Sequence, residues 1–472
     1  MSPQGPQGMV VAERPVAGEP RPYAFPPFRR TRLANGLSVV AVDMPGRPLL
    51  SAALVVPGGA TDEPAELAGA TILMARALAE GTADHDAVAL VEAIERLGAS
   101  LHAEAGWDAL SISLDVPAGR FAAALDLVAE VAARPTFPDS EVERLREERL
   151  NDILQARADP RRRAEDAFID TIYAPTSPYR RSSAGTTETV ERLDASTCRA
   201  ELARRFDPAR MSLIVGGDLA GIDVERLANE RFGGWVADPA TRPPGPIDAT
   251  PAARHRQIRV VHRPGSVQTE IRIGHPGAAR LIPDFHALAV MSAVLGGLFN
   301  SRLNRKLREE KGYTYGAHAG FDLRRGAGPF AARAPVDTAV TVPAILEMLA
   351  VIDGIGGGVS QVELDEARDY LVGVFPLRFE TAGAVVGALS GIVIQGLPDD
   401  ELARYRPAIQ AVTADDVVAA ATAHVHPDEL AIVLVGDADA FLPDLEAAGL
   451  GPIEVERDPV PASPEVGDDE DA

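Results

Sequence analysis

The chain has 472 residues, of which 46% are apolar and 24% are charged, and this balance excludes a chain that is disordered over most of its length. Its net charge of −23 excludes nucleic-acid binding unless a local basic face exists, because an acidic surface repels a phosphate backbone. The single cysteine, Cys198, excludes a disulfide within the chain and any metal cage built from cysteines.

Three segments have compositions that disfavour packed structure. Residues 1–26 are rich in proline and glycine and lack the basic and apolar regions of an export signal, so we expect a disordered tail on a cytoplasmic protein. Residues 237–255 contain five prolines and are expected to form a Pro-rich linker between two domains. Residues 456–472 hold seven acids and one arginine, which predicts an acidic disordered tail. No apolar run of about 18 residues is evident, so no membrane span is expected.

An internal repeat determines the predicted architecture. Motifs near the two ends of each half recur at a constant offset of 219 residues, which is difficult to obtain by chance over such a length. The matched pairs are Pro45 and Pro264, Pro57 and Pro276, Pro208 and Pro427, and Asp218 and Asp437. The repeat predicts a tandem duplication, with one domain over 27–236 and a homologous domain over 256–455.

Each half shows the same order of predicted elements. Two strands joined by a Pro-Gly turn precede a helix, an alternating strand, two long amphipathic helices and an apolar strand that ends in Gly-Asp. The predicted helices include Ala65–Ala79, Arg120–Ala133, Asp139–Ala158 and Phe285–Leu295. These patterns predict an α+β fold in which each of the two homologous domains has a mostly antiparallel sheet covered by helices.

The segment Gly69–Thr82, GATILMARALAEGT, resembles a helix of the insulinase or pitrilysin-like zinc metallopeptidase family, which reads roughly GLAHFLEHMLFKGT. In the H-x-x-E-H motif of that helix, two histidines one turn apart ligate zinc and the glutamate polarises the attacking water. Here the three positions hold Ile72, Ala75 and Arg76, and the position of the distal carboxylate ligand falls on Asp152. Isoleucine has no lone pair and arginine is a permanent cation, so we expect a degenerate zinc motif and no metal in this chain.

The segment Leu295–Phe321 contains a Gly-Gly loop, a short basic helix and an aromatic strand, and it resembles the family pattern GxxxxSRLxxxLREKxGxxY. The resemblance implies that Arg308 and Tyr315 bind substrate and stabilise the transition state in a zinc site carried by another domain. It also places Phe299 and Ser301 at substrate-binding positions. From residue types alone, Arg308 would be interpreted as a solvated helix arginine and Tyr315 as a core strand residue; the whole matching run favours the functional interpretation instead.

The segment Gly98–Val116 resembles the family pattern GGxxNAxTxxDxTxY, with His102 and Ala103 at the Asn-Ala positions. The resemblance implies that the edge of this strand pairs with an extended peptide, which requires little side-chain identity. A plain structural strand is the alternative.

Two further groups of residues are weaker candidates for a metal site or a nucleophile. His424 and His426 are spaced so that both could lie on one face of a strand and hold a metal, although a structural role is favoured because no third ligand is evident. Cys198 lies in a helix-like stretch where nothing nearby marks it as an activated nucleophile.

Together, the degenerate first half and the intact second half imply a non-catalytic subunit, forming half of a clamshell, of a heterodimeric zinc metallopeptidase. The expected partners are an H-x-x-E-H-bearing subunit of the same family, which would hold the zinc, and a peptide substrate. The alternative is a structural or scaffold homologue without a proteolytic role. An independent enzyme is not supported, because no nucleophile–base constellation is evident.

Overall fold

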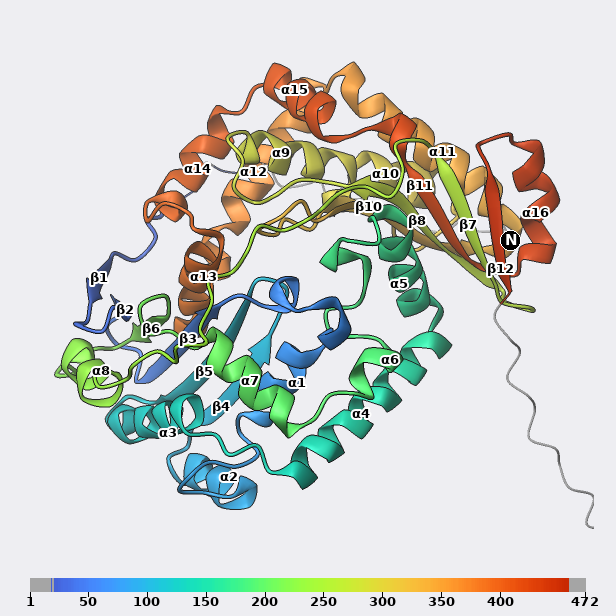
Figure 1. Ribbon diagram of the computed structural model, residues 1–472. Coiled ribbons are helices and arrows are strands. Elements are labelled where there is room, and N and C mark those ends of the chain that lie inside the picture. Colours follow the sequence, from blue (N-terminus) through green and yellow to red (C-terminus); the bar gives the residue numbers. More distant parts are fainter. Residues whose placement is uncertain (1–17, 19–20, 458–472) are drawn as a thin grey trace, which may run out of the picture.

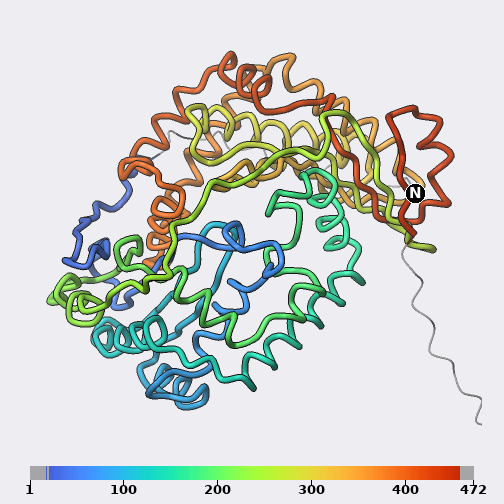
Figure 2. Tube along the Cα trace, viewed as in Figure 1, coloured from blue at the N-terminus to red at the C-terminus, as the bar shows by residue number. Residues whose placement is uncertain are grey.

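The computed structural model describes residue 18 and residues 21–457. The chain forms two lobes, which Figure 2 shows as a blue-to-green part and a yellow-to-red part of the trace. Residues 237–256, all of them described, contain no helix or strand and run between the lobes (Figure 2). A predicted tandem of two α+β domains is confirmed, since each lobe contains one six-stranded sheet covered by helices.

The first sheet has the strand order β1-β2-β6-β3-β5-β4. Its strands are β1 Phe28–Arg32, β2 Ser38–Asp43, β3 Leu49–Pro57, β4 Ser100–Ala105, β5 Ala109–Pro117 and β6 Ser212–Gly217. The second sheet has the order β12-β7-β11-β8-β10-β9. Its strands are β7 Gln257–His262, β8 Gln268–Pro276, β9 His318–Phe321, β10 Pro329–Asp337, β11 Ala431–Gly436 and β12 Ile453–Arg457.

Most neighbouring strands are antiparallel, as predicted, but both sheets are mixed. β2 pairs in parallel with β6, and β7 pairs in parallel with both β11 and β12. The outermost strand beside β2 comes from the N-terminal end of the described chain, whereas the one beside β7 comes from its C-terminal end. The two domains therefore fill the same place in the sheet with unrelated segments.

The repeated Gly-Asp at the end of each half has a structural reason. The Asp218 carboxylate accepts a hydrogen bond from the Gly46 amide at 3.0 Å, and the Asp437 carboxylate accepts one from the Gly265 amide at 2.9 Å. Each aspartate thus fastens a Pro-Gly turn, which joins β2 to β3 in the first domain and β7 to β8 in the second.

Helices cover the sheets of both domains. Those of the first half are α1 Ala70–Ala77, α2 Ala87–Arg96, α3 Phe121–Ala133, α4 Asp139–Ala158, α5 Pro160–Ile172, α6 Thr187–Val190, α7 Ala195–Arg205 and α8 Val224–Phe232. Those of the second half are α9 Phe285–Ser292, α10 Arg302–Asn304, α11 Thr341–Asp353, α12 Gln361–Val374, α13 Ala382–Gln395, α14 Glu401–Ala411, α15 Ala414–His424 and α16 Ala438–Ala447. α1 is shorter than the predicted helix 65–79, because Gly69 adopts φ +95° and interrupts the helical path before it.

Each half contributes one helix to the sheet of the other half. α5 packs on β8 and β11, and α13 packs on β3 and β6, so Figure 1 shows the orange α13 beside strands of the blue and cyan domain. Strand glycines make room for both helices. A Cβ on Gly216 would lie 3.0 Å from Val386 of α13, and one on Gly274 would lie 2.9 Å from Phe168 of α5 and 1.9 Å from the Phe330 carbonyl of β10. The two halves therefore share their apolar cores.

The segment before β1 is ordered against the second domain. The ring of Phe25 lies 5.1 Å from that of Phe379, edge to face, and the ring of Tyr23 lies 6.0 Å from that of Phe375. The disordered tail predicted for residues 1–26 therefore does not extend over 21–26, and most of its remainder lies outside the described residues. The predicted acidic tail begins inside β12, which ends at Arg457, and its other residues are also outside the described part.

One helical stretch, Thr338–Gly357, is long and apolar enough to cross a membrane by length and composition alone, contrary to the expectation from the sequence. Many of its apolar side chains, including Val342, Ile345, Met348 and Ile352, are buried in the core of the second domain, whereas Leu346 is 45% exposed. A helix that packs in a protein core needs the same composition, and that packing accounts for its hydropathy.

Candidate functional site

The start of α1 is held by a buried carboxylate. Glu63 accepts hydrogen bonds from the amides of Gly69 at 2.9 Å and Thr71 at 2.6 Å, which satisfies two donors at the helix N-terminus. Burial is the largest influence on Glu63 and raises the pKa of its carboxyl. A side chain at Gly69 would meet the Ala184 carbonyl at 2.8 Å, so this glycine is required by the backbone. The glycine that precedes the motif therefore has a structural role at the start of α1.

The three motif positions differ in their accessibility. Ile72 is half-buried and Arg76 is exposed, and their spacing of one turn places them on the same side of α1. Ala75 is fully buried, so the position of the family glutamate has no access to a water molecule or a peptide.

The Arg76 guanidinium lies beside the acidic face of α4. It donates a hydrogen bond to Glu148 at 3.0 Å and lies 3.9 Å from the Asp152 carboxylate, the predicted position of the distal ligand. The two acids are one helical turn apart on α4. A fixed cation of the protein therefore neutralises the carboxylates that a metal would need, and the residues present do not fit zinc.

A second arginine makes this corner more cationic. Arg149 is half-buried, donates a hydrogen bond through Nε to the Ala184 carbonyl at 3.0 Å, and has a pKa lowered chiefly by burial. Arg76 and Arg149 both line a small cavity of about 10 Å³, with room for about one water molecule. Sequence reasoning missed Glu148 and Arg149, although the i, i+4 spacing of Glu148 and Asp152 could have identified the acidic face.

The predicted peptide-binding strand lies at a sheet edge. β4 is the last strand of the first sheet and pairs only with β5 among the described strands, with His102 opposite Ser113 and Ala103 opposite Ile112. α1 packs beside it, and the His102 side chain is exposed. One edge of the β4 backbone is therefore open next to the degenerate motif.

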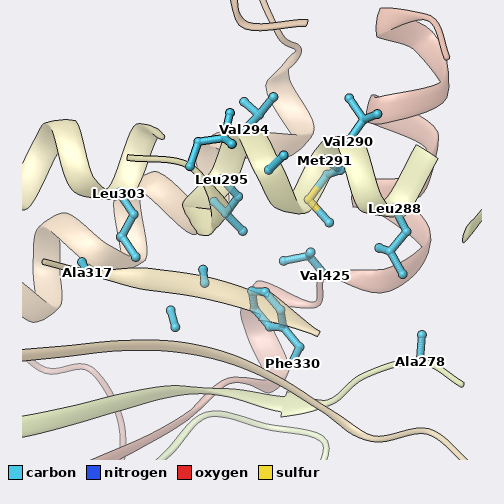
Figure 3. Close-up of a cluster of buried hydrophobic side chains, with 14 of the residues drawn as sticks. Ala278, Leu288, Val290, Met291, Val294, Leu295, Leu303, Ala317, Phe330 and Val425 are labelled. Atoms are coloured by element: carbon cyan, nitrogen blue, oxygen red, sulfur yellow. The ribbon is translucent and has the colours of Figure 1, made fainter. Parts of the chain in front are cut away.

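The Arg308 segment is anchored in the core of the second domain. α9 continues into a π-helical turn, Ala293–Gly297, and α10 continues into a second one, Arg305–Glu310. Figure 3 shows Leu295, Leu303 and Ala317 within the same apolar cluster as Phe330. Asn304 accepts a hydrogen bond from the Ala317 amide at 2.8 Å and so joins the two ends of the segment.

This anchoring presents two of the predicted residues to solvent. The Arg308 guanidinium lies 4.4 Å from the centroid of the Phe299 ring, and within the described part of the chain it forms no ion pair. Phe299 is 65% exposed and Tyr315 is 94% exposed, so Tyr315 is not a core strand residue. Ser301 differs, because it is buried and its hydroxyl has no hydrogen-bond partner, which does not fit contact with a substrate.

The histidines near the last strand do not form a metal site. His424 ends α15 and its Nε2 lies 2.8 Å from an Asp284 carboxylate oxygen, whereas the His426 amide donates to His275 Nε2 at 3.0 Å. The alternative in which both lie on one strand face is therefore wrong, because the chain turns between them before β11 begins at Ala431. Their roles are structural.

A group that the sequence did not reveal, comprising His262, Asp437 and Asp439, has ligand atoms within 4.8 Å of one another. His262 Nδ1 already accepts the Ala438 amide at 3.1 Å, and Asp439 is paired with Arg457 at 3.0 Å. These contacts account for the group as part of the link between β7, α16 and β12.

The fold and the site define a two-domain homologue of zinc metallopeptidases whose first domain lacks the metal ligands. Two family models match the chain: Insulinase (Peptidase family M16) over residues 38–186, and Peptidase M16 inactive domain over 199–371. Together they cover about two-thirds of the sequence. The chain belongs to the insulinase family, peptidase family M16.

Relatives in this family differ in their described activity. An uncharacterized zinc protease of Mycobacterium leprae is 27% identical over 76% of this chain and 81% of its own. A non-peptidase homolog of Helicobacter pylori is 24% identical over 80% of this chain and 87% of its own. The crystal structure of a peptidase M16 inactive domain from Pseudomonas fluorescens has a TM-score of 0.78 and 27% identity, and it covers 87% of this chain and 98% of that one.

Proposed function

We propose that the chain is the non-catalytic subunit of a heterodimeric zinc metallopeptidase. The observation that carries the proposal is the contrast between its two sites. In the first domain, Arg76 is paired with the acids of α4, so the zinc ligands are replaced. In the second, Arg308 and Tyr315 are presented on the surface, with no internal use among the described residues for their donors.

The partner in this proposal is an M16 subunit with an intact H-x-x-E-H motif, which holds the zinc that activates water. Arg308 is suited to the carbonyl or carboxylate groups of a peptide, because a guanidinium donates forked hydrogen bonds and keeps its charge. The Tyr315 hydroxyl is suited to donate a hydrogen bond to the oxyanion of the tetrahedral intermediate, an effect of about 3 kcal/mol in comparable sites.

The open edge of β4 supplies a second contact for an extended peptide. Main-chain hydrogen bonds along a strand edge bind peptides of many sequences. The exposed His102 and the half-buried Ala103 lie on this strand, so a peptide there would pass beside α1 without meeting a metal of this chain.

The test combines the chain with the H-x-x-E-H-bearing relative from the same genome and measures cleavage of an extended fluorogenic peptide. We expect zinc-dependent cleavage only by the mixture. Tyr315→Phe should lower kcat by about 100-fold, the usual effect of losing one oxyanion donor, and Arg308→Ala should lower kcat/KM by a similar factor. The affinity between the two chains should not change.

Matched controls lie on the same segment. Arg305→Ala removes another exposed guanidinium one turn away, and Tyr313→Phe removes a hydroxyl from a partly buried ring; neither should affect cleavage. Full activity of both Arg308→Ala and Tyr315→Phe would refute the shared site.

A scaffold role is the second candidate, and it is favoured by the relative described as a non-peptidase homolog. Under this role the chain would stabilise an assembly without contributing to cleavage. Absence of peptide cleavage in every complex with an M16 partner, with the complex itself intact, would support it.

A further inference from the structure

The outward face of α12 carries large apolar side chains at helical spacing. Val362 and Tyr370 are 66% and 52% exposed, and Leu377, in the 3₁₀ turn Pro376–Phe379 that follows, is 63% exposed. Glu366 and Asp369 are exposed on the same side of the helix. With Phe299, these five residues form what we call the α12 face. Exposed apolar side chains that gather on one helix face can mark a contact surface.

The duplication supplies an internal comparison. At the 219-residue offset, α12 and its following turn correspond to α4, and buried Leu364 and Val372 match buried Leu145 and Ile153.

The exposed positions do not match in the same way. Val362, Tyr370 and Leu377 correspond to Glu143, Asn151 and Ala158, and all six are exposed. The fold itself therefore does not require apolar residues on this face of the helix.

The α12 face is continuous with the surface that carries Arg308. Asn300 donates a hydrogen bond to Glu366 at 2.5 Å, and Arg302 donates two to Glu363, at 2.7 and 2.9 Å. These bonds fasten the loop that carries Phe299 to the first half of α12, and the Phe299 ring in turn lies under Arg308. A partner that Arg308 reaches would meet the α12 face as well.

We propose that the α12 face binds the catalytic subunit, through an apolar surface bordered by lysine or arginine; this inference rests on the proposed function. Glu366 and Asp369 form no ion pair among the described residues, so a basic partner would complement them. A second copy of this chain would bring two acidic faces together at a net charge of −23 each, which opposes self-association.

The test measures heterodimer affinity by sedimentation velocity, using the zinc-loaded H-x-x-E-H relative from the same genome. The variant is Val362→Glu with Tyr370→Glu, which places charges in the contact without touching the core. We expect its Kd to rise at least tenfold, the range found when central contact residues are lost. Leu154→Glu, the same exchange on the 61% exposed Leu154 of α4, should leave the Kd unchanged.

The outcomes separate the two proposals. Wild-type affinity of the double variant would overturn the α12 face, while peptide cleavage by the mixture would keep the proposed function. A weakened heterodimer whose wild-type form never cleaves peptides would keep the α12 face and overturn the proposed function. A wild-type homodimer that the double variant dissociates would show that the occupant is a second copy and would overturn the assignment to the catalytic subunit.

Discussion

Restoring two histidines should return zinc binding to the first domain without returning catalysis. Ile72 and Arg76 lie one turn apart on the accessible side of α1, and Asp152 faces Arg76 from α4. The variant Ile72→His with Arg76→His therefore provides two imidazoles and one carboxylate, the usual three protein ligands of a catalytic-type zinc site. Ala75 is left unchanged, because a glutamate at a fully buried position would be overpacked and unpaired.

The structure gives the size of the effect. The ion pairs of Arg76 join side chains that are 38–50% exposed, so removing them costs no more than about 1 kcal/mol each. Zinc at 100 times its Kd should then stabilise the double variant by about 2.7 kcal/mol and raise its Tm accordingly. The wild-type chain should show no such shift.

The assay is a calorimetric titration with zinc, accompanied by thermal unfolding with and without a chelator. Adding Asp152→Ala to the double variant should weaken zinc binding at least tenfold, because the third ligand is lost. A double variant that folds normally and binds no zinc would show that α1 and α4 no longer hold ligands at zinc distances, and it would refute the view that only the donor atoms were lost.

Two other predictions concern buried ionisable side chains. Burial lowers the pKa of His275 to about 4, and its Nε2 accepts a hydrogen bond from the His426 amide, so protonation of the ring favours the unfolded chain. The free energy of unfolding should therefore fall by about 3 kcal/mol as the pH drops from about 6.5 to about 4. Urea unfolding of His275→Gln should lose this part of the pH dependence, and the same pH dependence in the wild-type chain and the variant would contradict the prediction. Glu201→Gln leaves the buried guanidinium of Arg205 without its charged partner and should cost about 3–5 kcal/mol in urea unfolding. Glu92→Gln, the same exchange in an exposed ion pair, should cost less than about 1 kcal/mol, and equal small losses from both variants would show that water compensates the charge of Arg205.

The sequence was sufficient for the parts of the fold that depend on local pattern and repetition. The 219-residue offset predicted the correspondence of the two halves, and α4 spans the predicted residues Asp139–Ala158. The start of α1 was misplaced because propensity does not reveal that Gly69 adopts a positive φ. Tyr23 and Phe25 were assigned to a disordered tail, since two aromatics in a Pro-rich stretch give no sign of a distant aromatic cluster.

The candidate site was predictable in residue types but not in contacts. The loss of zinc ligands follows from Ile72 and Arg76 alone, whereas the pairing of Arg76 with Glu148 depends on how α1 packs against α4. The burial of Ser301 could not be predicted either, because a serine between Asn300 and Arg302 has the sequence pattern of a polar surface.

The exchange of α5 and α13 has a consequence for biogenesis. When the ribosome has completed the first domain, β3 and β6 still lack the helix that covers them, and they remain uncovered until residues 382–395 are made. The first half therefore cannot finish folding as an independent module, and severing the chain at residues 237–256 would leave each fragment with an open sheet and a helix without its sheet. Two fragments made together could complement each other, and intact chains at high concentration could trade these helices between molecules.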